Sequence, residues 1–104
     1  MESKKYTLPK EFAERWVAAL RSGLYKQSTA HLYNDNGYCC LGVACNLEDV
    51  SDEKLFGQIY PNFDWLPLEI KYNNLDIECA TLNDHLGYSF AEIADWIEAN
   101  VEFI

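Results

Sequence analysis

The chain has 104 residues, the size of one domain, and its 49% hydrophobic and 14% aromatic content excludes the polar, aromatic-poor disordered class. No run approaches the ~18 consecutive apolar residues that span a bilayer. The N-terminal residues also lack the apolar run of a signal peptide. We therefore expect one domain, 1–104, that stays in the cytoplasm and does not enter a membrane.

The net charge of −9 is unevenly distributed along the chain. Residues 1–45 carry six basic and four acidic side chains, whereas residues 46–104 carry two basic and thirteen acidic ones. Because the acidic half repels phosphates, we expect no binding to nucleic-acid polymers or anionic membranes. The acidic half serves either as solubilising charge or as a face that docks on a basic partner.

The first predicted element is a helix over 9–22. Pro9 stands at the first helical position, Glu11 lies in the first turn, and Gly23 ends the helix. One apolar stripe follows helical spacing: Phe12, Trp16, Ala19 and Leu20.

A short hairpin and a second helix come next. Asn36-Gly37 lies between two short apolar or aromatic runs, the strongest local hairpin signal, and predicts a two-stranded ribbon. Residues 40–48 are apolar most of the way round a helix, which predicts a central, buried one. Gly42 within it costs ~1 kcal/mol relative to Ala, so we expect another backbone to pack closely there.

The second half of the chain predicts two further helices. Residues 48–64 are expected to form a loop, and the Leu-Pro-x-Glu pattern predicts a short helix over 67–73. Ser89 and Glu92 form a capping box for a last helix over 89–101. The predicted fold is α+β, mainly α: three main helices and a short one, with a small two-stranded β-ribbon.

Four cysteines invite a chemical interpretation, but none of them forms a Cys-x-x-Cys motif. We expect free, buried thiols of a reducing compartment. Cys40, at a helix N-terminus, is a candidate hydrolase nucleophile that would need one of the two histidines as its base. The spacing does not match zinc sites, so no metal or cofactor is expected. The residues concerned are Cys39, Cys40, Cys45, Cys79, His31 and His85.

Two polar stretches are candidate ligand-binding sites. The first, at the end of the first helix, offers two cations, a hydroxyl, an amide and an aromatic ring, namely Arg21, Ser22, Tyr25, Lys26 and Gln27. Such groups grip phosphate or carboxylate and stack on a base, although basic residues also suit a solvated helix C-terminus. The second stretch, Asn83 and Asp84, forms either a turn or part of a site. We expect Gly23 to turn the first stretch toward the second, giving one polar pocket.

Four stretches, 16–27, 38–45, 82–87 and 89–97, together resemble an uncharacterised family of small bacteriophage and prophage proteins. The shared pattern is W-x-x-A-L-R-S-G-x-Y-x-Q, then Y-C-C-L-G-V-x-C, then L-N-D-x-x-G-x-S-F-x-x-I-A. The resemblance implies a phage setting and no particular activity. It also implies that position 85 is not fixed as His, which weakens His85 as a base.

By analogy with small phage proteins that counter host defences, we expect a non-enzymatic binding protein. The first hypothesis is that it sequesters a small anionic ligand, such as a nucleotide signal. The alternative is an inhibitor that docks its acidic surface on a basic host protein, and the second alternative is a hydrolase using Cys40. The sequence is compatible with a monomer or an oligomer.

Overall fold

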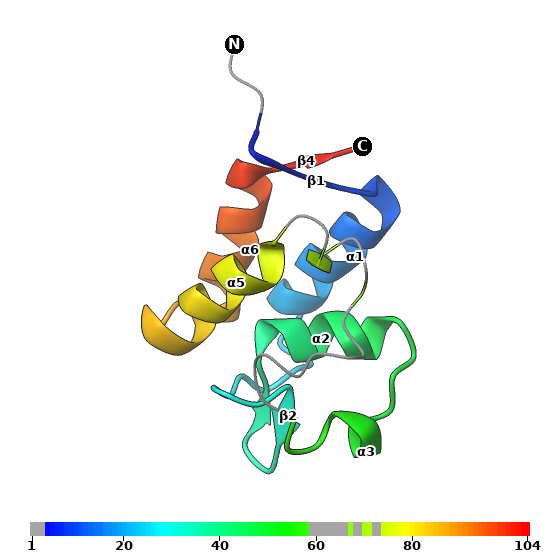
Figure 1. Ribbon diagram of the computed structural model, residues 1–104, viewed down its shortest axis with the longest axis vertical. Coiled ribbons are helices and arrows are strands. Elements are labelled where there is room, and N and C mark those ends of the chain that lie inside the picture. The colour runs from blue at the N-terminus through cyan, green and yellow to red at the C-terminus, as the bar shows by residue number, and fades with distance from the viewer. Residues whose placement is uncertain (1–3, 59–66, 68–69, 72–73) are drawn as a thin grey trace.

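The computed structural model describes residues 4–58, 67, 70–71 and 74–104 (Figure 1). The α+β, mainly α class predicted from the sequence is confirmed. The elements in chain order are β1 Tyr6–Leu8, α1 Lys10–Arg21, β2 Tyr33–Asn34, β3 Gly37–Tyr38, α2 Cys40–Leu47, α3 Asp52–Leu55, α5 Leu75–Ala80, the π-helical turn η1 Thr81–His85, α6 Phe90–Asn100 and β4 Val101–Phe103.

The two ends of the chain pair with each other, which the sequence did not predict. β1 and β4 form a parallel ladder in which Tyr6 lies opposite Val101. Two further backbone bonds extend the ladder: Ile104 N donates to Leu8 O at 2.9 Å, and Lys10 N donates to Ile104 O at 2.8 Å. Figure 1 shows β1 and β4 at one end of the molecule and β2 at the other. The pairing therefore joins the start of α1 to the end of α6.

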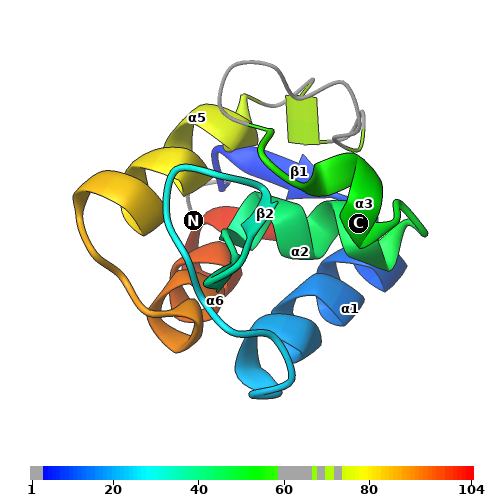
Figure 2. The same ribbon diagram turned by 90° about the horizontal axis from the view of Figure 1, so that it is seen from below.

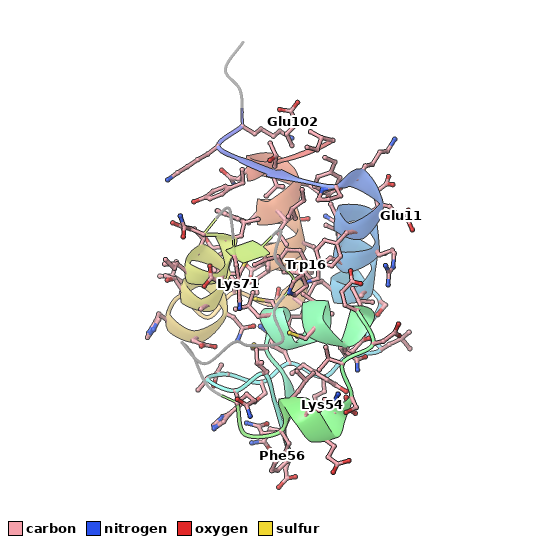
Figure 3. The ribbon with its side chains drawn as sticks, turned by 45° about the vertical axis from the view of Figure 1, so that its right-hand side comes forward. Glu11, Trp16, Lys54, Phe56, Lys71 and Glu102 are labelled. Atoms are coloured by element: carbon pink, nitrogen blue, oxygen red, sulfur yellow. The ribbon has the colours of Figure 1, made fainter. Side chains whose placement is uncertain are left out.

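Helix α2 lies at the centre, with α1, α3, α5 and α6 around it (Figure 2). Its Val43 is fully buried, as are Trp16 of α1 and Ile97 of α6. Trp16 lies between these helices (Figure 3), and its indole Nε1 donates to Cys40 O at 3.0 Å. This bond satisfies the polar atom of a fully buried ring, which allows the indole to fill the core. Leu47, which lies in the helix over 40–48 that was predicted to be buried, is half-buried.

The predicted helix ends agree with the structure to within one residue. Pro9, predicted at the first helical position, is instead the N-cap of α1, which begins at Lys10, and α6 carries the predicted capping box. In that box Ser89 Oγ accepts from Glu92 N at 3.1 Å, while Ser89 N donates to Glu92 Oε1 at 2.9 Å. The hairpin is confirmed, with Tyr33 opposite Tyr38.

Two helical segments differ from the prediction. Within the expected loop at 48–64, Ser51 caps the short helix α3, while residues 59–66 lie outside the described residues. Ile70 and Lys71 are helical, but the rest of the predicted helix over 67–73 is described only at Pro67. No helix was predicted over 75–85, where α5 runs into η1. Six residues are too short a stretch for periodicity to identify, so burial of the α5 side chains on α2 decides the structure there.

Gly42 lies where two backbone segments approach closely. A Cβ placed on Gly42 would lie 1.8 Å from the carbonyl oxygen of Leu32, an atom of the main chain that cannot swing aside. The predicted close packing is thus observed, with the segment before the hairpin as the neighbour. The absence of a side chain at this position is what lets α2 occupy the centre of the fold.

We predict that Gly42→Ala lowers the free energy of unfolding by ~3 kcal/mol or more, because overpacking against backbone forces the two segments apart. Gly23→Ala is the matched control. Gly23 has φ +77°, and a methyl group added there would have no neighbour within 4 Å, so only local backbone strain, ~1 kcal/mol, is expected. Urea denaturation followed by circular dichroism measures the free energy of unfolding of both variants. Equal losses would show that the contact with Leu32 O is not tight.

Candidate functional site

The predicted ligand residues at the end of α1 face different partners. Arg21 donates to Asp95 Oδ1 at 2.6 Å and also to a carboxylate oxygen of Glu98. Hydrogen bonds to Glu98 and then Asp95 raise the pKa of the Arg21 guanidinium above its usual value. Ser22 Oγ donates to Ala19 O at 2.7 Å, which ties the hydroxyl to the last turn of α1. Arg21 is therefore already engaged with carboxylates of the chain itself.

Tyr25 and Lys26 turn toward the hairpin rather than toward Asn83. The Tyr25 hydroxyl donates to Asn46 Oδ1 at 2.8 Å, and its ring meets Tyr38 edge-on with centroids 5.0 Å apart. The Lys26 side chain is exposed, while its carbonyl accepts from Tyr38 N at 2.8 Å. The expected pocket thus does not include Tyr25 beside the Asn83–Asp84 turn.

Gln27 is the residue of the first stretch that meets the second. Its amide Nε2 donates to Asn83 Oδ1 at 2.9 Å and to Tyr88 O at 2.8 Å. Its Oε1 accepts from Phe90 N at 3.0 Å, one of the donors that the first turn of α6 leaves without a helical partner. One side chain therefore connects the segment after α1 to the beginning of α6.

Asn83, only 1% exposed, is the centre of this network. Its Oδ1 also accepts from Cys40 N at 3.3 Å, and its Nδ2 donates to Ser28 O and to Asp84 Oδ1, both at 2.8 Å. The same Asp84 oxygen accepts from Ala30 N at 3.0 Å. Within the described part of the chain, no buried side-chain nitrogen or oxygen lacks a hydrogen-bond partner. The two polar stretches meet at Gln27 and Asn83, which bond to each other and to the neighbouring backbone. A ligand role for these stretches stays a prediction.

The π-helical turn η1 explains how a polar residue comes to lie in the core. The wider turn follows directly on α5, and both Leu82 and Asn83 are buried within it. Such turns are short insertions in α-helices and often occur at functional sites. Here the turn carries the Asn83 amide inward to the start of α2.

The four thiols are free and buried. Cys39 Sγ accepts from Gly42 N as the N-cap of α2, and Cys40 Sγ donates to Cys79 O at 3.4 Å. Burial raises the pKa of Cys39 and Cys40, and raises that of Cys45 to about 12. These thiols are held protonated, the opposite of what a nucleophile needs.

The histidines do not supply a partner for Cys40 in the contacts described. His31 is half-buried, and its Nδ1 lies 3.2 Å from Asn34 Nδ2, while His85 is exposed. Within the described ranges, no group of three or more His, Cys, Asp or Glu side chains is placed to hold a metal ion.

Helix α6 and strand β4 expose several acidic side chains. We call this surface the acidic face and define it by four exposed side chains, Glu92, Asp95, Glu98 and Glu102. Helix α6 runs along the long axis of the molecule (Figure 1), and Figure 3 shows Glu102 at the end opposite Phe56. Beside β4, a hollow of about 390 Å³ is lined by Lys4, Glu98, Val101, Glu102 and Phe103.

A second hollow on α6, which we call the α6 groove, was missed by the sequence analysis. It is an open groove of about 390 Å³, lined by Tyr88, Glu92, Asp95, Trp96, Ala99 and Asn100. The Trp96 ring is held on one side by the Tyr6 ring, with centroids 5.8 Å apart, and Asn100 Nδ2 donates to Trp96 O at 2.9 Å. The sequence did contain a signal for this groove. Four of the lining residues follow at intervals of four, the spacing of neighbours on a helix surface: Tyr88, Glu92, Trp96 and Asn100.

Comparison with known proteins adds a family but no activity. A family model described as a domain of unknown function (DUF8296) matches residues 8–59, half of the chain. The matched segment includes Arg21 and Gln27 but ends before Asn83 and α6. Neither a curated protein nor a solved structure matches the chain. Among the helices described, none combines the length and apolarity that crossing a membrane requires.

We predict that Asn83→Ala lowers the free energy of unfolding by ~3 kcal/mol, because it leaves Cys40 N and Ser28 O buried without their partner. Thr29→Ala, an exposed position, should change it by less than ~0.5 kcal/mol. Urea denaturation measures both. A loss below ~1 kcal/mol for Asn83→Ala would mean that water replaces the amide and that the network is not structural.

We also predict that iodoacetamide labels the native protein slowly at every pH from 7 to 9.5, because all four thiols are buried and the raised pKa values of Cys39, Cys40 and Cys45 keep these three protonated. In urea the labelling rate should instead increase with pH, with a midpoint at about 8.5, the pKa of a free thiol. Mass spectrometry counts the labels. Rapid modification of native Cys40 at pH 7 would revive the hydrolase hypothesis.

Proposed function

The chain belongs to the family described as a domain of unknown function (DUF8296), and from that starting point we propose a function on the basis of its surface. We propose that it is a non-enzymatic binding protein that docks its acidic face on a basic surface of another protein. The phage setting implied by the sequence resemblance belongs to this proposal. The partner would then be a host protein in the cytoplasm, and docking would inhibit it.

The observation that carries the proposal is the arrangement of the acidic face. Its four carboxylates are exposed along one helix and the strand that follows it, and two hollows open beside them. Among the described residues, Arg21 and Lys4 are the cations that contact this surface, through Asp95, Glu98 and the Glu98 carbonyl. Complementary charge speeds encounter with a basic partner and fixes its orientation.

The same geometry weighs against a small anion at Arg21. Both ion pairs of Arg21 run from Nη2, and an anion bound at the other donors of this guanidinium would lie beside the two negative charges of Asp95 and Glu98. Like charges at such distances repel. Sequestration of a nucleotide through Lys26 and the neighbouring polar groups stays a prediction, and it is included in the test below.

The hydrolase alternative has less support. Its nucleophile, Cys40, is fully buried, and its Sγ is bonded to Cys79 O. Burial is the largest of the effects that raise the pKa of this thiol. A substrate would have to open the core to reach it.

The test uses a fluorescein-labelled hepta-arginine peptide as a defined basic probe, with binding followed by anisotropy. The triple variant Glu92→Gln, Glu98→Gln and Glu102→Gln removes three charges of the acidic face while keeping Asp95 for Arg21. Gln at position 92 also preserves the capping box. We expect affinity at 50 mM salt to fall at least tenfold. Binding of the unmodified protein should weaken strongly at 300 mM salt, because screening shortens the range of exposed charges.

The matched control removes the same number of charges at a distance from α6: Asp35→Asn, Glu48→Gln and Glu53→Gln, all exposed. We expect a loss of threefold or less. Equal losses in the two variants would show that overall charge, not a face, attracts the probe, and would contradict the proposal. A thermal-shift series with ATP runs in parallel. Stabilisation approaching ~2.7 kcal/mol at a hundredfold excess over Kd would favour sequestration instead.

A further inference from the structure

The α6 groove gives the acidic face a specific anchor point. We infer that this groove accepts an arginine side chain of the basic partner, whose guanidinium lies against the Trp96 ring and bonds to Glu92 and Asp95. The inference rests on the proposed docking function and goes further by naming the group recognised.

The polar side chains around the groove favour a cationic donor. Glu92 and Asp95 are exposed carboxylates, and the described residues that line the groove include no Lys or Arg. Asp95 Oδ1 accepts from Arg21, which lies outside this lining, so Glu92 and the second oxygen of Asp95 are the acceptors offered to a ligand. One N–H of the Asn100 amide donates to Trp96 O at 2.9 Å, and the amide oxygen adds a further acceptor. These acceptors and the negative charge of Glu92 favour a ligand that brings hydrogen-bond donors and positive charge.

The aromatic residues distinguish arginine from lysine. Tyr88 and Trp96 are half-buried side chains on the same groove as the carboxylates, and the Tyr6 ring supports the Trp96 ring from the side of β1. A planar guanidinium stacks on an aromatic ring while its edge donates to carboxylates, whereas a compact ammonium ion remains strongly hydrated. Rings and carboxylates in one groove thus match the two surfaces of a guanidinium.

The shape of the groove indicates a side chain presented by a partner rather than an enclosed small molecule. It is open along α6, and Ala99 lies three and four positions after Trp96 and Asp95, so its small side chain leaves space between those two. Small-molecule sites usually enclose most of their ligand, and this groove does not. The rest of the binding surface would come from the remaining acidic face.

The experiment compares hepta-arginine with hepta-lysine, two probes of equal charge. We expect hepta-arginine to bind about fivefold more tightly, the effect of one exposed cation–π contact. Ala99→Leu fills the groove without changing charge and should reduce the affinity for hepta-arginine to that for hepta-lysine. The control is Ala18→Leu, the same replacement at an exposed position of α1, which should preserve the difference.

A second readout follows the rings directly. In 1H–15N spectra, the indole signal that disappears in Trp96→Phe belongs to Trp96, and we expect hepta-arginine to shift this signal more than those of the other two tryptophans. If Ala99→Leu keeps the preference for arginine, or if the Trp96 signal does not move, the anchor is wrong. The docking proposal would still stand if the triple variant of the acidic face loses much more affinity for hepta-arginine than the control triple variant does. If the two triple variants lose equal affinity, the docking proposal fails as well.

Discussion

The buried amide of Asn83 is the interaction on which the rest of the structure depends. It joins the segment after α1, the first residue of α2 and the turn before α6, through bonds to Gln27, Cys40 and Ser28. A buried polar group is costly without partners, so all of these segments must take up their positions together. The π-helical turn that brings Asn83 inward is therefore a condition for the central placement of α2.

The hydrogen bonds that these polar side chains make within the chain have a consequence for function. Gln27 and Asn83 make hydrogen bonds within the chain through both their amide nitrogen and their amide oxygen, and Asp84 Oδ1 accepts from Asn83. Arg21 Nη2 is likewise bonded to Asp95 and Glu98. Burial also raises the pKa of Cys39, Cys40 and Cys45, which keeps these thiols protonated. What the described structure offers to a partner is its outer surface, where the carboxylates of α6 stand beside aromatic rings in an open groove.

The candidate site was predictable in part. The sequence identified Gln27 and Asn83 as members of two polar stretches that meet, and it identified the second half of the chain as acidic. It could not predict that Arg21 would reach across to Asp95, because 74 positions separate the two residues. The α6 groove was missed for another reason: Trp96 and Tyr88 belong to a pattern that also suits a helix covered by neighbouring elements.

Local chemistry determined the helices α1, α2 and α6 and the hairpin, since capping residues, a turn dipeptide and apolar periodicity act over a few positions. Tertiary structure alone decided the β1–β4 pairing, whose residues Tyr6 and Val101 come from opposite ends of the chain. It also decided α5 and η1, which are too short to be stable as isolated helices and depend on burial of Leu75 and Cys79. The physical reason is sequence separation. Helix caps, turns and apolar periodicity depend on residues a few positions apart, whereas residues far apart in the sequence come into contact only when the core forms.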